Sequence, residues 1–113
     1  MQIQSIAGAE PFTTKDGSTI RELHHTAAQS LAEASLGPGG ATQRHYHART
    51  EEIYMFLAGG GEVEIDGERA TVTAGDAVLI PPGARHTLSA GDDGASFLCC
   101  CAPPYADEDT FFE

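Results

Sequence analysis

The sequence has few basic residues and no long apolar run. Six Lys and Arg stand against 17 Asp and Glu among 113 residues, so the formal net charge is −11. A surface that negative repels phosphate backbones and anionic lipids, and we therefore expect no nucleic-acid partner and no membrane partner. No apolar stretch approaches the roughly 18–20 residues of a membrane span. The N-terminus lacks the basic start and apolar stretch of a signal peptide, which leads us to expect a cytoplasmic protein.

Cysteine is scarce and confined to one place, at Cys99, Cys100 and Cys101. Adjacent residues of a strand point to opposite faces, so these neighbours do not easily form a disulfide. An odd, clustered set with no other cysteine to pair with is typical of a reducing compartment. We interpret the three as small apolar residues that close the last strand. A reactive thiol is the alternative.

The length and the spacing of turns predict one all-β domain. A chain of 113 residues is short for two domains, yet long enough to bury a core without disulfides. Turns rich in Gly, Pro and Asp recur about every eight to twelve residues, and almost no segment has helical periodicity. This pattern is typical of β-sandwiches and barrels. The predicted strands span residues 20–23, 30–36, 42–47, 52–58, 62–65, 69–73, 77–80, 86–89 and 96–101.

Three of the five histidines and one glutamate form a pattern that suits a metal ion. His45 and His47 are two residues apart, so both imidazoles point to the same face of a strand. Glu52 begins the next predicted strand, and His86 follows a Pro-Pro-Gly turn that leads into another. Three neutral imidazoles and one carboxylate inside a small barrel suit a first-row transition metal. Such a set leaves positions open for water or substrate on a six-coordinate ion.

The same residues resemble the two signature motifs of the cupin superfamily. Residues 39–59 read G-x5-H-x-H-x4-E-x6-G, and residues 75–86 read G-x5-P-x-G-x2-H. The resemblance implies a single cupin domain over residues 1–113, folded as a double-stranded β-helix (jelly-roll) barrel. It also implies that one divalent ion (Fe, Mn, Ni, Co or Zn) is bound by four ligands: His45, His47, Glu52 and His86. The second motif departs from the family at Ala90, where Asn is common, and we interpret this as a looser turn.

Side chains on the same strand faces as these four residues are expected to line the cavity, because strand side chains alternate with period two. The expected substrate-binding residues are Gln43, Tyr54, Phe56 and Leu88. Tyr54 is also the candidate catalytic residue, through a hydrogen bond to substrate or through proton transfer. A wall residue with no chemical role is the alternative for Tyr54.

The outward faces of the strands are expected to form an interface between two copies of the chain. Ile53, Met55 and Leu57 point outward, where an apolar row has no core of its own to enter. Such a row usually meets another surface, so we expect a homodimer through sheet packing, which also fits the family.

The C-terminal tail, residues 103–113, is expected to be peripheral. Proline has no N–H donor, so Pro103 and Pro104 cannot begin a core strand. Phe111 and Phe112 are expected to pack over the barrel or onto a partner subunit. Trimming the chain after Pro104 should then spare metal binding.

Three functions remain open at this point. A metal-dependent enzyme would act on a small organic molecule, as a dioxygenase with iron or as an isomerase or lyase with an ion that polarises a carbonyl. A non-catalytic module would use the metal to bind or sense a small molecule, and a purely structural metal is the third possibility. No cluster of Lys or Arg in the pocket strands would hold a phosphate. We favour the enzyme, by analogy at the level of the fold.

Overall fold

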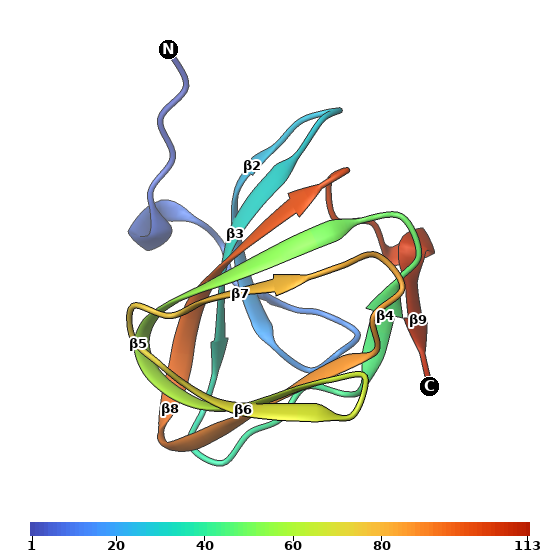
Figure 1. Cartoon of the computed structure of the whole chain (residues 1–113). Helices are drawn as coiled ribbons and strands as arrows, with labels where there is room; N and C mark the ends of the chain where they lie inside the picture. The colour runs from blue at the N-terminus through green and yellow to red at the C-terminus, as the bar shows by residue number, and fades with distance from the viewer.

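The computed structural model describes residues 1–113, and its regular elements are β-strands apart from two short 3-10 turns, which confirms the all-β prediction. Figure 1 shows the strands curling around a common interior, as in a jelly-roll barrel. The elements are η1 (Ile6–Gly8), β1 (Phe12–Thr13), β2 (Thr19–His25), β3 (Ser30–Leu36), β4 (His45–His47), β5 (Glu51–Ile65), β6 (Glu68–Thr73), β7 (Ala77–Ile80), β8 (His86–Ala102), η2 (Asp107–Asp109) and β9 (Thr110–Phe112). The two helices are single 3-10 turns, and no helix could cross a membrane.

Two long strands, β5 and β8, connect the two halves of the barrel. They pair antiparallel along most of their length, and each also borders shorter strands: β6 and β7 beside β5, β3 and β4 beside β8. The sequence predicts two short strands in place of each long one, separated at its glycines. The strands in fact continue through these points, with register shifts between Phe56 and Ala58 and between Gly59 and Gly61. A Cβ on Gly61 would collide with the carbonyl oxygen of Ser89, so glycine lets the two strands cross closely while they bend.

The C-terminal tail is part of the sheet, which corrects the expectation that residues 103–113 are peripheral. Strand β9 pairs antiparallel with β4, so that His47 lies opposite Thr110 and His45 opposite Phe112. Figure 1 shows the two strands side by side. The prolines keep only the start of the tail out of the sheet, because the residues after η2 have free N–H donors. Within the chain, Phe112 packs against His45 and Phe111 stacks on Tyr46, both on β4.

The alternation along β5 separates the core from the outer surface. Tyr54 and Phe56 are buried, whereas Ile53 and Leu57 are 39% and 44% exposed. The predicted inward and outward faces of this strand are therefore confirmed. Phe56 packs against Phe97 of β8, with ring centroids 5.1 Å apart, and this pair is part of the core of the barrel.

Candidate metal centre

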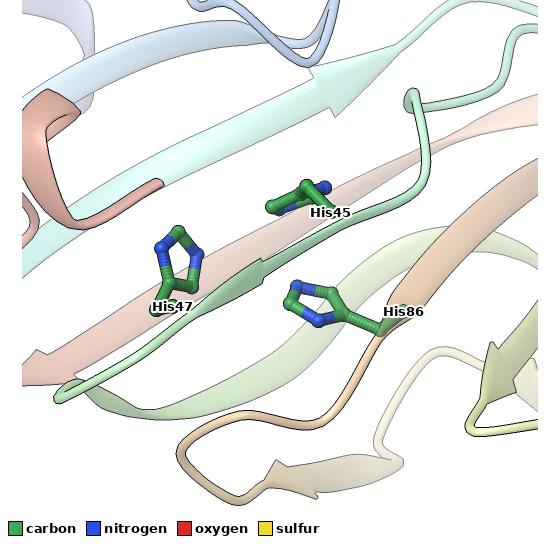
Figure 2. Close-up of side chains that lie close together, drawn as sticks. All are labelled: His45, His47 and His86. Atoms are coloured by element: carbon green, nitrogen blue, oxygen red, sulfur yellow. The ribbon is translucent and has the colours of Figure 1, made fainter. Parts of the chain in front are cut away.

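Three histidine rings from two strands meet in the interior. His45 and His47 lie on the same face of β4, and His86, the first residue of β8, pairs directly with His45. All three side chains are buried, and one ring nitrogen of each lies within 4.8 Å of those of the other two. Figure 2 shows the three rings grouped around a shared space. The structure therefore brings together three side chains that the motif spacing had selected.

Hydrogen bonds at Nδ1 fix the orientation of each ring. The Nδ1 atoms of His45 and His86 donate to the carbonyl oxygens of Gln43 (2.7 Å) and Ala84 (2.9 Å). The Nδ1 of His47 lies 3.2 Å from Oγ1 of Thr110.

The Thr110 hydroxyl donates its only hydrogen to the carbonyl of Ala106, so it accepts the proton of His47 Nδ1. With a proton on each Nδ1, every Nε2 keeps a free lone pair. This is the tautomer that a metal-binding histidine needs.

The Glu52 carboxylate lies beside two of these Nε2 atoms. Its Oε1 is 3.6 Å from Nε2 of His47 and 3.5 Å from Nε2 of His86, while its Oε2 accepts a hydrogen bond of 3.2 Å from Sγ of Cys101. Burial alone would raise the pKa of Glu52. Without an ion, hydrogen bonds and charge from the protonated rings of His47 and His86 outweigh burial and hold this pKa far below its usual range; a bound cation would take the place of those protons. The carboxylate is therefore charged at neutral pH.

Two atoms of this cluster have no hydrogen-bond partner although they are fully buried: Oε1 of Glu52 and Nε2 of His86. Leaving a buried polar atom unpaired costs free energy, and here both atoms are acceptors that face each other. A divalent cation between them would satisfy both. The donor set of imidazole nitrogens and a carboxylate oxygen therefore fits a first-row transition metal.

A cavity opens beside the cluster, and only some of the predicted substrate-binding residues reach it. Tyr54 is among the residues that line it. Phe56 and Leu88 are buried in the core and do not border the cavity. The side chain of Gln43 is exposed, because β4 begins only at His45 and the alternation does not extend back to residue 43. Gln43 instead contributes its carbonyl oxygen to His45.

Several side chains that line this cavity were not predicted from the sequence: Asp16, Phe97, Cys99, Cys101, Tyr105 and Thr110. The strand pairing accounts for the two cysteines, since Cys99 lies opposite Tyr54 and Cys101 opposite Glu52. Side chains alternate between the two faces of β8, so Cys99 and Cys101 could have been predicted to face the cavity if the register of β8 with β5 had been known. Asp16 and Thr110 carry no comparable signal, because one lies in an Asp-Gly turn and the other in the tail.

The three cysteines are free thiols. Burial, followed by the charge of Glu52, raises the pKa of each of them. Protonated thiols are poor nucleophiles, which favours their interpretation as small apolar residues. Cys101 has the additional role of holding one oxygen of Glu52.

Comparison with known proteins identifies the class to which this fold and site belong. Residues 32–101 match the cupin domain family, and the chain therefore belongs to the cupins. An uncharacterised protein of Methanocaldococcus jannaschii is 44% identical over 107 residues, which cover 89% of this chain and 86% of that protein.

One sequence relative and one solved structure of similar fold have described activities. The dimethylsulfoniopropionate lyase DddW of Ruegeria pomeroyi is 40% identical over 67 residues, which cover 59% of this chain but only 43% of DddW. The structure of Pac13 from Streptomyces, a nucleoside dehydratase, superimposes with a TM-score of 0.83 at 18% identity, covering 100% of this chain and 91% of Pac13. The likeness to Pac13 shows the shared fold.

The hydrogen bond between Thr110 and His47 provides a first prediction. Thr110→Val keeps the shape of the side chain but removes the acceptor of His47 Nδ1, so the ring loses its fixed tautomer. We expect metal affinity to fall about tenfold while the fold is retained, because the partners of ligand histidines typically contribute this much. Competition with a chromophoric chelator measures the effect. Thr71→Val, on the exposed face of β6, is the control, and equal affinities in both variants would show that Thr110 does not orient His47.

Proposed function

We propose that this cupin is a metal-dependent enzyme that acts on a small, uncharged organic molecule, with His45, His47, Glu52 and His86 as the metal ligands. The observation that carries the proposal is the meeting of three Nε2 lone pairs with an unpartnered carboxylate oxygen beside a cavity. A bound divalent ion would supply Lewis-acid polarisation of a substrate oxygen or, as iron, the activation of dioxygen.

The charges of the cavity disfavour an anionic substrate. Asp16, Glu22 and Glu52 are among its lining residues, and no Lys or Arg is. Without a basic partner, a phosphate or carboxylate group on the substrate would meet like charges outside the ion itself. Apolar walls such as Ile20 and Phe97 would contact the carbon skeleton.

Tyr54 is suited to hold the substrate by a hydrogen bond. Burial, followed by the charge of Glu52, raises its pKa well above the usual value, so the phenol keeps its proton at neutral pH. A protonated phenol donates a hydrogen bond and does not act as a base from this state. We therefore propose that Tyr54 orients a substrate oxygen beside the metal centre.

The relatives support lyase chemistry in particular. DddW is a lyase and Pac13 a dehydratase, and both names describe elimination from a small molecule. In an elimination a base takes a proton and the leaving group departs with the bonding electrons. An ion held by the proposed ligands would acidify that proton by polarising a neighbouring oxygen or carbonyl. The same four ligands also suit a metal ion that catalyses isomerisation or activates dioxygen.

Elemental analysis of protein purified without added metal or chelator is the first test. One transition-metal ion per chain is expected. Oxygen uptake is then measured after anaerobic loading with Fe(II), in the presence of diketones, catechols and thiols. Uptake would indicate a dioxygenase, and zinc, nickel or manganese without uptake would support lyase or isomerase screens. No metal, even after loading, would overturn the proposed site, whereas an ion without turnover would favour a non-catalytic binding module.

We further propose that the outer face of β5 and β7 forms a homodimer. Ile53 lies beside Leu79 of β7 and Cys100 of β8, and Ile53 and Leu79 are 39% and 55% exposed. Contiguous apolar surface of this kind favours contact with another copy of the chain. Ile53→Glu should convert a dimer into a monomer by light scattering, while Thr71→Glu should not. A wild-type protein that is already monomeric would contradict the proposal.

A cytoplasmic location is proposed as well. Three free thiols support it, because such thiols persist in a reducing compartment. Cell fractionation with antibody detection tests it, and recovery of the protein outside the cytoplasm would refute it.

A further inference from the structure

The loop between β1 and β2 brings a second carboxylate to the metal centre. Oδ2 of Asp16 lies 3.6 Å from Nε2 of His45, and the Asp16 side chain is only 15% exposed. This is the same separation as that between Glu52 Oε1 and His47 Nε2. Asp16 is outside both motifs that define the other ligands.

The other oxygen of Asp16 is held by three donors. Its Oδ1 accepts hydrogen bonds from Thr14 Oγ1 (2.6 Å), Ser18 Oγ (2.7 Å) and the backbone N–H of Ser18 (2.9 Å). The carbonyl of Asp16 accepts a further bond of 2.7 Å from the N–H of Gln43, two residues before His45. These contacts fix the carboxylate relative to the His45 ring before any ligand arrives.

The two facing atoms are both acceptors. The proton of the His45 ring lies on Nδ1, which donates to Gln43, so Nε2 presents a lone pair to Asp16 Oδ2. A carboxylate oxygen and a lone pair at this distance repel each other unless a cation or a donor lies between them. Glu52 has the same arrangement: Cys101 holds one of its oxygens, and the other faces the nitrogens of His47 and His86.

We propose that Asp16 is an additional ligand of the metal centre and approaches the ion from the cavity side. The inference rests on the proposed function, since it requires that the histidines bind an ion. Two atoms that share one ion at bonds of about 2.1 Å lie no more than about 4.2 Å apart. The separation of 3.6 Å between Asp16 Oδ2 and His45 Nε2 satisfies this limit, and since Asp16 lies outside the group of three histidine nitrogens within 4.8 Å of one another, it would reach the ion from the His45 side. Two carboxylates also balance the charge of a divalent ion, so the filled site would not attract anionic molecules and would select for uncharged ones.

Asp16→Asn provides the test, with Glu22→Gln as its matched control. Asn keeps the size of the side chain and an acceptor for the Ser18 N–H but removes the charge. Glu22 also lines the cavity, but its carboxylate contacts only His25 on the surface and no histidine of the metal centre. Both variants and the wild type are loaded with Co(II). Affinity is measured by chelator competition, and the visible absorption bands report the ligand field.

We expect Asp16→Asn to bind Co(II) about tenfold to a hundredfold more weakly, with altered bands, and Glu22→Gln to behave as the wild type. Wild-type affinity and bands in Asp16→Asn would overturn the role of Asp16 alone. A wild-type protein that binds no Co(II) would overturn the proposed function together with this inference.

A second variant keeps the test valid if Asp16→Asn does not fold. Thr14→Val removes one of the three donors to Oδ1 and leaves the carboxylate in place. We expect Co(II) affinity to fall about fivefold, as for the loss of one orienting hydrogen bond. Unchanged affinity would show that the position of Asp16 does not matter to the ion.

Discussion

Replacing His45 by alanine is expected to abolish stable binding of a divalent ion while the chain stays folded. The change removes one of three converging nitrogens, a larger loss than that of a residue that only orients a ligand. Loss of an orienting partner costs about tenfold to a hundredfold in metal affinity, so removal of the ligand itself should cost more than about a hundredfold. The measurement is the metal content after purification, followed by chelator competition.

The fold should survive this change because His45 is not part of the apolar core. Its ring contacts His86, at 4.2 Å between centroids, and Phe112, at 6.0 Å, next to the cavity. His24→Ala is the matched control, because His24 lies on β2 outside the cluster. Circular dichroism checks that both variants are folded. A His45→Ala protein that retains a full equivalent of tightly bound metal would show that His45 is not a ligand.

The sequence was sufficient to predict the three histidines of the cluster because their placement depends on local geometry. Two residues on one strand share a face whenever they are two positions apart, which fixes His45 and His47. The turn before His86 starts a new strand at a defined position, and the pairing of β8 with β4 then brings His86 opposite His45. The two cupin motifs contain both features: the histidines two positions apart on one strand and the turn that precedes the third histidine.

Alternation predicts the face of a residue but not its depth in the barrel. Phe56 and Leu88 do point inward, yet they lie in the core and not along the cavity. The side chain of Gln43 does not line the cavity for a different reason. Gln43 precedes β4, so the alternation of side chains along that strand does not extend to it. Depth depends on how the sheet curves around the interior, and the sequence of a single strand does not determine this curvature.

Residues that meet the site through long-range contacts could not be predicted. Thr110 orients His47 from 63 positions away, and Asp16 faces His45 from a loop before β2. Neither contact produces a periodicity or a spacing in the sequence, because each depends on the closure of the whole barrel. Alignment of relatives by motif alone would miss both residues for the same reason.

Deleting the chain after Pro104 is expected to lower both thermal stability and metal affinity, in contrast to the expectation from the sequence. The deletion removes β9 and the buried Asp109, whose carboxylate accepts hydrogen bonds from the N–H groups of Arg49 and Thr50. Hydrogen bonds to a charged group contribute about 1.5–3 kcal/mol each. A loss of this size should lower Tm by at least about 5 °C in a domain of this length.

Metal affinity should fall at least about tenfold in the same truncated protein, because Thr110 no longer orients His47. Thermal denaturation and chelator competition measure the two effects. Deleting residues 1–4 is the control, since this exposed segment lies outside every strand and should change neither property. If the protein truncated after Pro104 keeps the Tm and the metal affinity of the full chain, β9 contributes nothing to the site, and the tail is peripheral after all.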